Sequence, residues 1–314
     1  MITGWPKKAK HFDCAALASH LAEVTGGAAH ADKLLAPYTS YKIGGPTSVW
    51  VAPQTETAVG RVLEIIHAAE VPLFVLGRGS NVLISDKGWH GVTLYLGENL
   101  SGWEFQNLEA HVLAGTRLID LVRSTVEKGL GGMELLAGIP GGVGGALRMN
   151  AGAFGREIEK VTAAVSGFRP NGSPFQADRC NIYFGYRQAP ELADVIITAA
   201  RLCFEKSDPA ALRARMEDIL SLRAKKQPLK FPSCGSVFKR PAGYYAGALI
   251  EEAGLKGHRI GGAMVSRKHA GFILNVADAA ASDVYALIRL IEKMVFERFG
   301  VRLEREVKLI GEFE

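Results

Sequence analysis

The sequence predicts an α+β protein in which helices and strands are intermixed along the chain. Segments with apolar residues at helical spacing alternate with short apolar runs of strand length. The chain has 314 residues, more than one small core organises, which predicts two or three sub-domains. Its apolar content of 48% and charged content of 22% are those of an ordinary globular protein.

We predict the helices and strands from the spacing of apolar residues and from the prolines and glycines at their ends. Residues 1–35 are expected to form a mobile lead-in that ends in a short helix, with no assigned role. Pro209 suits the first position of a helix, and Gly300 suits the residue that ends one. In chain order we predict helices over 56–70, 117–128, 209–226, 244–253 and 282–299, and strands over 71–77, 92–97, 111–115, 161–168, 195–204, 270–276 and 306–310. Boundaries are predicted near 207–209 and, less sharply, near 97–110.

Charge and cysteine spacing exclude several classes of function. The net charge of +5 is scattered without a long basic run, which argues against nucleic acid and suits anionic small molecules. The four cysteines have no C-x-x-C spacing, so we predict neither a metal site nor a disulfide framework. No apolar run approaches the roughly 20 residues that span a bilayer. No secretory signal pattern is present, which favours the cytoplasm.

Glycine-rich clusters point to a ligand that lies against the backbone. Many of the 36 glycines fall in clusters, and the three clusters that matter here lie in residues 40–46, 76–81 and 137–155. Consecutive N–H groups in turns bind anions, and glycine lets a phosphate come close. The segment Gly77–Asn81, called the glycine loop below, is therefore a predicted pyrophosphate cradle; a plain β-turn is the alternative. No P-loop or complete Rossmann fingerprint is present, so a dinucleotide would bind to another fold.

The segment PSCGSVFK (232–239) places Ser236 on a turn beside a glycine and before a lysine. A nucleophilic serine needs an activating base, and no histidine is near in sequence. The turn is also not a G-x-S-x-G elbow. Ser236 is therefore predicted to donate a proton or a hydrogen bond beside a cofactor, with a polar turn at a sheet edge as the alternative.

Taken together, these segments resemble the UDP-N-acetylenolpyruvoylglucosamine reductases of peptidoglycan synthesis. The resemblance covers roughly residues 36–314. It rests on eight motifs in the family's order: YTSYKIGGP (38–46), LGRGSNVL (76–83), GIPGGVGGALRMNAGAFG (138–155), YFGYR (183–187), PSCGSVFKRP (232–241), AGALIEEAGLKGHRIGGAMVS (246–266), KHAGFILN (268–275) and LEREVKLIG (303–311).

The resemblance implies a fold and its boundaries. It implies an FAD-binding domain of the PCMH or vanillyl-alcohol-oxidase type in two α+β lobes, followed by an α+β substrate domain, in the shorter type II form. Lobe 1 would span 36–97, completed by 306–314. Lobe 2 would span 98–207, and the substrate domain 208–305.

It also implies a cytoplasmic, NADPH-dependent flavoprotein reductase with FAD held non-covalently. The reaction would reduce UDP-N-acetylglucosamine enolpyruvate to UDP-N-acetylmuramate for cell wall biogenesis, and so would serve cell shape and the cell cycle through division. The expected partners are this UDP-sugar enolpyruvyl ether and NADPH.

Carried over residue by residue, the resemblance implies three catalytic side chains: Ser236 as proton donor, Arg187 of the tyrosine–arginine pair, and Glu306. Substrate contacts are implied for Lys226, Lys239 and Arg240. Cofactor contacts are implied for Tyr41, Ile43, Gly44, Gly77, Arg78, Gly79, Ser80, Asn81, Gly138, Pro140, Gly141, Gly142, Gly145, Asn150 and Gly152. The chain departs from the family pattern at Ala189, Arg240 and Met264.

These residues suit reduction of an enolpyruvyl ether. Hydride addition sends negative charge into the carboxylate, where a permanently cationic Arg187 would stabilise it. Glu306 would donate only if protonated, and burial beside a substrate carboxylate raises a carboxyl pKa. Taken singly, each residue has an ordinary alternative: Arg187 a surface ion pair, Glu306 a solvent-facing strand position, and Lys226 the end of a charged helix. Two alternative functions stay open: a flavin-dependent alcohol or lactone oxidase of the same fold class, and a nucleotide-sugar binding module without flavin.

Overall fold

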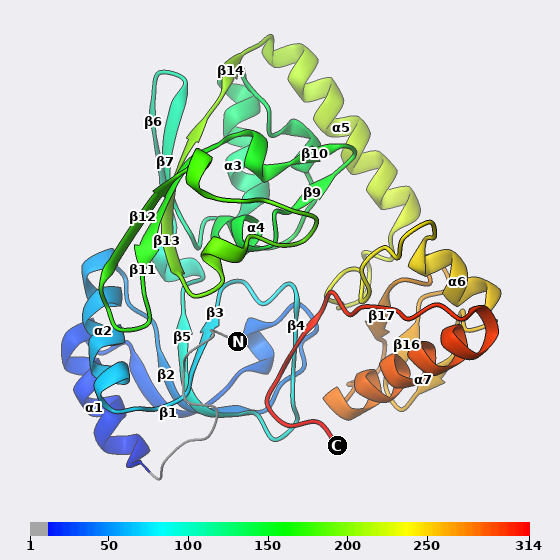
Figure 1. Cartoon of the computed structure of the whole chain (residues 1–314), viewed down its shortest axis with the longest axis horizontal. Helices are drawn as coiled ribbons and strands as arrows, with labels where there is room; N and C mark the ends of the chain where they lie inside the picture. The colour runs from blue at the N-terminus through cyan, green and yellow to red at the C-terminus, as the bar shows by residue number, and fades with distance from the viewer. Residues whose placement is uncertain (1–11) are drawn as a thin grey trace. The chain divides into compact units, whose positions relative to one another are not determined.

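The computed structural model describes residues 12–314, which divide into two compact units (Figure 1). The first unit contains residues 12–33, 48–78 and 90–222. The second contains residues 34–47, 79–89 and 223–314. Each unit is therefore assembled from three separate stretches of chain.

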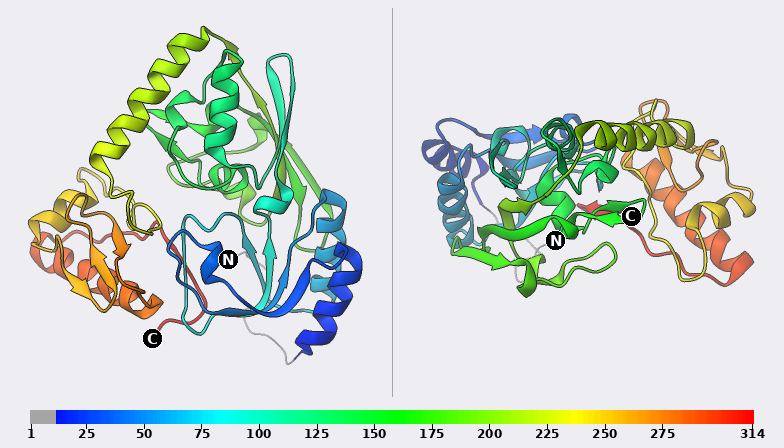
Figure 2. Two further views of the ribbon diagram at one scale, coloured as in Figure 1. Left: turned by 180° about the vertical axis from the view of Figure 1, so that it is seen from behind. Right: turned by 90° about the horizontal axis from the view of Figure 1, so that it is seen from above.

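One layer of the first unit is a four-stranded sheet in the order β1-β2-β5-β3, in which β3 and β5 run parallel. Its elements are α1 (Cys14–Thr25), β1 (Ala29–Leu34), β2 (Pro46–Val51), α2 (Glu56–Ala68), β3 (Leu73–Leu76), β5 (Trp89–Tyr95) and η2 (Glu98–Leu100). The α1 and α2 helices lie side by side (Figure 2). Leu21 of α1 and Leu63 of α2 are fully buried in the same apolar cluster as Val92 of β5.

The other layer is a five-stranded antiparallel sheet in the order β12-β11-β13-β7-β6. Its strands are β6 (Trp103–Gln106), β7 (Glu109–Leu113), β11 (Thr162–Phe168), β12 (Pro174–Asp178) and β13 (Ile196–Cys203). Packed with them are α3 (Leu118–Glu127), β8 (Leu130–Gly131), η3 (Glu134–Leu136), α4 (Val143–Arg148), β9 (Gly152–Ala153), β10 (Arg156–Glu157), η4 (Ile158–Lys160), η5 (Arg179–Asn181), η6 (Pro190–Leu192) and β14 (Glu205–Lys206).

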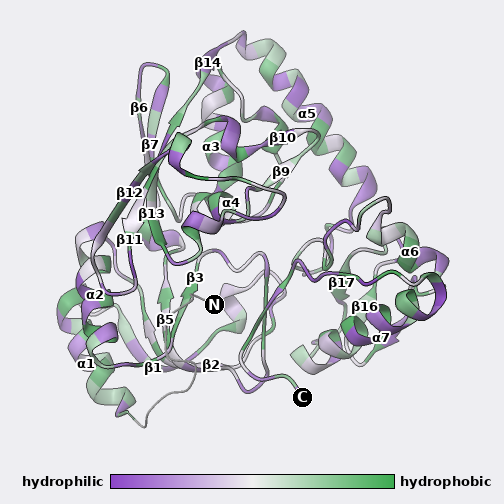
Figure 3. Ribbon diagram, in the orientation of Figure 1, coloured by the Kyte–Doolittle hydropathy of each residue, from purple (hydrophilic) through white to green (hydrophobic). Residues whose placement is uncertain are grey.

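The helix α5 (Pro209–Lys226) begins in the first unit and ends in the second. Leu212, Met216 and Ile219 pack on the core of the five-stranded sheet, while most of the remaining side chains are exposed. Hydrophilic residues accordingly recur along the whole length of α5 (Figure 3).

The second unit contains η1 (Ala36–Tyr38), β4 (Val82–Ile84), α6 (Ala246–Glu252), β15 (Arg259–Ile260), β16 (Ala263–Val265), β17 (Ile273–Asn275), α7 (Ala281–Phe299) and β18 (Lys308–Ile310). Although β4 and β18 are more than 200 residues apart in sequence, they pair in parallel. The Asp86 carboxylate accepts the N–H groups of Ala281 and Ser282 at 2.7 and 2.9 Å, and so caps α7 from outside the helix. At the other end of α7, Gly300 has φ of 69°.

Most predicted elements occur within a few residues of their expected bounds. The prediction of a mobile lead-in is wrong for residues 12–34, because α1 packs on α2 and β1 joins the sheet. Residues 1–11 lie outside the described residues. The strand predicted over 270–276 is shorter, because a turn occupies its first residues and only 273–275 pair with β16. No helix within residues 12–314 is both long and apolar enough to cross a membrane.

Candidate cofactor and catalytic site

The glycine loop follows β3, and its first half is held within the first unit by Arg78. The Arg78 guanidinium donates through Nε to the carbonyl oxygen of Gly115 at 2.8 Å and lies 3.5 Å from Glu98. Burial lowers the pKa of Arg78 below its ordinary value, but a guanidinium remains charged at neutral pH. Arg78 therefore fixes this part of the loop and keeps a positive charge beside it.

The second half of the loop is held in the second unit. The Gly79 carbonyl oxygen accepts the backbone N–H of Ser40 at 3.0 Å and its hydroxyl at 3.2 Å. The Thr39 hydroxyl donates to the carbonyl oxygen of Ile43 and accepts the N–H of the same residue. These bonds join the segment before β2 to the glycine loop. The side chain of Ile43 is buried, so it does not face a ligand.

The glycine-rich segment 138–145 is fastened to the connection between β7 and α3. The N–H of Val143 donates to Thr116 at 3.0 Å, and that of Gly144 donates to Ala114 at 2.8 Å. Gly138 and Gly141 adopt φ of 76° and 110°, values that favour glycine for conformational reasons. Pro140 between them is exposed, so this turn presents its surface outward.

Two of the predicted cofactor-contacting glycines border open space. Neither Gly77 nor Gly145 has a positive φ, and within residues 12–314 a Cβ at either position would meet no atom within 4 Å beyond its chain neighbours and, for Gly145, the backbone of its own helix. At Gly79, by contrast, a Cβ would lie 2.2 Å from the carbonyl oxygen of Tyr38. Open space against the backbone at Gly77 and Gly145 suits a bound group, so these residues fit the flavin nucleotide that the resemblance implies.

Arg187 lies in the first unit on a tight turn between Gly185 and Gln188, whose backbone groups bond to each other at 3.0 and 3.3 Å. Its φ of 57° is uncommon for a side chain of this size and is typical of functional sites. Its Nη2 donates to the carbonyl oxygen of Gly152 at 3.2 Å. Fully buried Asn150 donates to the Gly185 carbonyl oxygen at 3.2 Å. Asn150 and Gly152 thus anchor the turn that carries Arg187.

Ser236 and Glu306 lie on adjoining backbone segments of the second unit. Ser236 bridges to Phe272, and Gly235 before it has φ of 82°. The N–H groups of Glu306 and Val307 both donate to the Val237 carbonyl oxygen, at 2.8 and 3.3 Å. Two residues therefore face one, which is the pattern of a β-bulge, a feature that re-aims side chains beside active sites.

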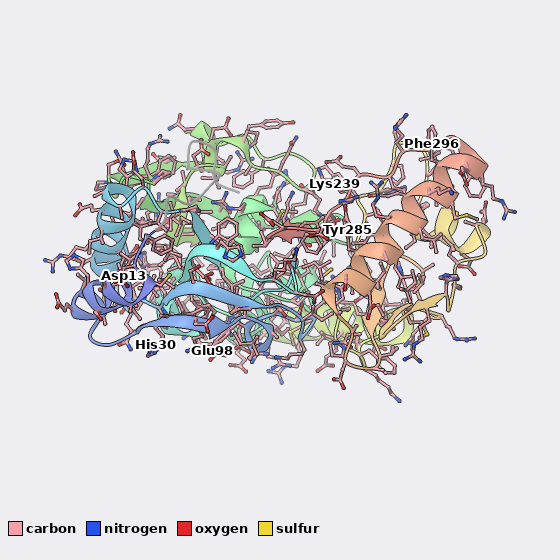
Figure 4. The ribbon with its side chains drawn as sticks, turned by 90° about the horizontal axis from the view of Figure 1, so that it is seen from below. Asp13, His30, Glu98, Lys239, Tyr285 and Phe296 are labelled. Atoms are coloured by element: carbon pink, nitrogen blue, oxygen red, sulfur yellow. The ribbon has the colours of Figure 1, made fainter. Side chains whose placement is uncertain are left out.

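The three predicted substrate-binding cations have different surroundings. The ammonium of Lys239, a residue labelled in Figure 4, forms a close ion pair with the Glu304 carboxylate, and the backbone N–H of Lys239 donates to the Glu304 carbonyl oxygen at 2.8 Å. The Arg240 guanidinium lies 4.0 Å from the centre of the exposed Tyr245 ring. Lys226 is exposed at the end of α5. Arg240 and Lys226 are accessible to an anionic ligand, whereas Lys239 already has a carboxylate partner.

Two buried polar side chains, Tyr41 and Cys234, form a pair near Ser236, because Cys234 stands two residues before it in the sequence. Tyr41 is fully buried, and its hydroxyl makes no hydrogen bond of regular geometry within residues 12–314. The Cys234 thiol, a weak hydrogen-bonding group, nevertheless interacts with this hydroxyl. Burial raises the pKa of Tyr41 well above its ordinary value. Burial likewise raises the pKa of the Cys234 thiol to about 12, and Glu306 contributes to that rise. Both groups are therefore neutral at physiological pH.

The structure brings Ser236, Glu306 and Lys239 together in one unit, and it brings Arg187, Asn150 and Gly152 together in the other. Sequence reasoning missed the bulge at Glu306, the Tyr41–Cys234 pair and the side-chain bond of Asn81 described below. No periodic or motif signal marks a bulge, since its two residues look like any strand residues. Within residues 12–314 no cluster of side chains suited to a metal ion occurs.

Comparison with known proteins defines the class first. Residues 47–173 match the FAD binding domain family. Residues 227–310 match the family described as UDP-N-acetylenolpyruvoylglucosamine reductase, C-terminal domain. The protein is thus a flavoprotein oxidoreductase in class, with an FAD-binding domain followed by a second conserved domain, and the predicted fold class is confirmed.

The individual relatives then give the family. The chain is 42% identical over 280 residues to the UDP-N-acetylenolpyruvoylglucosamine reductase of Listeria innocua and 40% identical over 277 residues to that of Syntrophomonas wolfei. These matches cover 88% of this chain and 93% and 92% of those proteins. The crystal structure of the enzyme (MurB) from Thermus caldophilus aligns with a TM-score of 0.74 at 36% identity, covering 89% of this chain and 98% of that one. The chain belongs to the UDP-N-acetylenolpyruvoylglucosamine reductase family.

Proposed function

We propose that the protein reduces UDP-N-acetylglucosamine enolpyruvate to UDP-N-acetylmuramate, with NADPH as hydride donor, in the synthesis of peptidoglycan precursors. The observation that carries the proposal is the joining of Ser236 and Glu306. They are 70 positions apart in sequence, yet their backbones meet at Val237 through the bulge. A hydroxyl and a carboxyl held on adjoining segments can serve one proton transfer.

The contacts with FAD are proposed from the glycines that border open space and from the glycine-rich loops that hydrogen bonds hold in place. Gly77, Gly145 and the N–H groups of the glycine loop would lie against FAD, held without a covalent bond. When bound, FAD supplies the hydride chemistry that no protein side chain provides. The remaining chemistry falls to the residues of the chain.

The charge that develops on the substrate decides the role of each side chain. Hydride addition to the terminal carbon of the enolpyruvyl group drives negative charge into its carboxylate. Arg187 would bind that carboxylate, because a guanidinium offers two parallel N–H donors. Glu306 would stabilise the same charge as a neutral carboxyl, and Ser236 would deliver the proton to the adjacent carbon.

Substrate binding is proposed for the accessible cations. Lys226 and Arg240 would contact the diphosphate, for which Arg240 offers a bidentate fork. Lys239 would act mainly by holding Glu304 and the strand of Glu306, because its ammonium already pairs with Glu304.

The proposal is tested by following flavin absorbance under anaerobic conditions. NADPH is added first, and UDP-N-acetylglucosamine enolpyruvate second. We expect bleaching by NADPH and recovery on addition of the sugar. Bleaching without recovery would remove the proposed acceptor, and a protein that takes up no FAD would overturn the flavin mechanism altogether.

A further inference from the structure

Asn81 stands where the glycine loop becomes β4, and β4 pairs in parallel with β18. The N–H of Lys308 donates to the Asn81 carbonyl oxygen at 3.0 Å, and the N–H of Ser85 donates to that of Ile310 at 2.8 Å. In a parallel ladder such bonds alternate evenly between the strands. Continued by one step, the ladder would have the backbone N–H of Asn81 donate to Glu306.

The structure departs from the ladder at this step. The side-chain Nδ2 of Asn81 donates to the Glu306 carbonyl oxygen, at 3.1 Å. The backbone N–H of Asn81 donates to no backbone carbonyl in residues 12–314. A side chain has thus replaced a ladder bond. The replacement releases the Asn81 N–H at the end of the glycine loop, where consecutive N–H groups can bind an anion.

The same bond completes the support of Glu306. On one side the N–H of Glu306 donates to Val237 in the bulge, and on the other its carbonyl oxygen accepts from Asn81. Next to it, Arg305 forms two hydrogen bonds with Glu292 of α7, at 2.5 and 2.7 Å. The guanidinium also lies over the ring of Tyr285, labelled in Figure 4. The backbone of Glu306 is therefore fixed from both of its peptide groups.

We propose that Asn81 is a positioning residue for Glu306, and that its side-chain bond couples the glycine loop to the segment before β18 that carries the Glu306 carboxyl. The inference rests on the proposed function, because it assigns Asn81 a part in the sugar-reducing step. Loss of the side-chain bond frees one peptide group of the bulge. Displacing a reacting group by about 1 Å can cost about 100-fold in rate.

The test compares Asn81→Asp with the wild type. Asp has the same shape but presents an oxygen to the Glu306 carbonyl oxygen, so it cannot donate the bond. We expect re-oxidation of the reduced flavin by the enolpyruvyl sugar to slow about 10–100-fold, and to slow more than its reduction by NADPH does. In flavin-free protein we expect faster hydrogen exchange of the peptide covering residues 304–310. Asn81→Ala is the second variant if the aspartate does not fold.

Asn275→Asp is the matched control. Asn275 makes the same kind of bond in the same unit, from Nδ2 to the carbonyl oxygen of Tyr41, also at 3.1 Å. We expect this variant to lose stability but to leave exchange at residues 304–310 unchanged. Equal slowing of the sugar step by Asn81→Asp and Asn275→Asp would overturn the proposal, because the effect would then be general loosening.

The outcomes separate this proposal from the proposed function. If the sugar fails to re-oxidise wild-type flavin, the proposed function fails, while the exchange experiment still decides whether Asn81 holds the 304–310 strand. If wild type turns over and Asn81→Asp matches it, the positioning role is overturned. Unchanged exchange in both Asn81 variants overturns it as well.

Discussion

At the scale of single residues, the site combines satisfied and unsatisfied polar groups. Asn150 is fully buried and uses its side chain to hold the turn of Arg187. The Tyr41 hydroxyl is equally buried but makes no hydrogen bond of regular geometry within residues 12–314, and interacts only weakly with the Cys234 thiol. A buried polar group is normally bonded, so an exception marks a position where stability is not maximal. The motifs predicted that both residues belong to the site, but their different bonding depends on side-chain geometry that no motif encodes.

Ser236→Ala should separate the two halves of the reaction. The variant should retain FAD and still be reduced by NADPH. Re-oxidation by the enolpyruvyl sugar should slow about 10²–10³-fold, the typical cost of a lost donor at a developing charge. Stopped-flow absorbance of the flavin measures both steps. Ser233→Ala, in the same turn, is the control and should behave as wild type; near-normal turnover in Ser236→Ala would refute the proton-donor role.

Tyr41→Phe should stabilise the flavin-free protein by about 1 kcal/mol, because it removes a desolvated hydroxyl whose contact with the Cys234 thiol is only a weak hydrogen bond. Thermal unfolding of the flavin-free protein measures the change. Thr39→Val is the opposite control, since its buried hydroxyl donates to Ile43 at 2.9 Å and the substitution leaves that carbonyl unpaired. A lower melting temperature for Tyr41→Phe would show that the hydroxyl has a stronger partner in solution.

At the scale of elements, periodicity predicted long helices well and short strands poorly. Helix α7 was expected over 282–299 and spans Ala281–Phe299, because its apolar residues recur over five turns. Strands β1 and β2 were missed, and β17 has only three residues. Such strands owe their existence to partners far away in sequence, as β4 does to β18. The bulge at Glu306 and the substituted ladder bond of Asn81 arise from the same distant pairing.

Protonation of His269, in the turn before β17, should lower the free energy of unfolding in mildly acidic solution. Burial lowers the pKa of His269 from its ordinary value, and its Nδ1 accepts the N–H of Gly271 at 3.2 Å. Lys256 lowers this pKa further, whereas Glu251 and a backbone hydrogen bond raise it. Because the folded pKa is below the unfolded value, near 6.5, the unfolded chain binds more protons as pH falls through this range. The contribution of neutral His269 to the free energy of unfolding is therefore fully present above about pH 6.5 and is lost as the pH falls towards the folded pKa.

Thermal unfolding between pH 8 and pH 5 measures this effect. His269→Asn is the informative variant, because its Oδ1 can accept the Gly271 N–H and does not titrate. As the pH falls, the melting temperature of the wild type should decrease more than that of His269→Asn. The Gly271 carbonyl oxygen accepts the N–H of Val237, next to Ser236, at 2.9 Å, so the sugar step should weaken in the same range. Parallel pH profiles for the two proteins would contradict the assignment.

At the scale of the whole molecule, the two units are interleaved along the chain. The chain passes between them after residues 33, 47, 78, 89 and 222. The sequence indicated a boundary near 207–209, where α5 begins, whereas the chain passes to the second unit only after residue 222, within α5. The lobe boundaries implied by the family resemblance stay a prediction. A linear sequence shows where composition changes, whereas the short segments 34–47 and 79–89 join the second unit through long-range contacts that composition does not reveal.

Binding of FAD should raise the free energy of unfolding of the whole protein, and most of this rise should require that position 77 has no side chain. Free FAD at 100 times its dissociation constant contributes about 2.7 kcal/mol if it binds only the folded chain. Gly77→Ala should keep or slightly raise the flavin-free melting temperature, because its φ is ordinary and its Cβ would meet no atom of residues 12–314 within 4 Å beyond its chain neighbours. The same methyl should remove most of the FAD-dependent rise, because it fills the space proposed for the cofactor. Gly79→Ala should instead lower the melting temperature with or without FAD, since its φ is 61° and its Cβ would lie 2.2 Å from Tyr38. Differential scanning fluorimetry against FAD concentration distinguishes these results, and a wild-type response in Gly77→Ala would place the cofactor elsewhere.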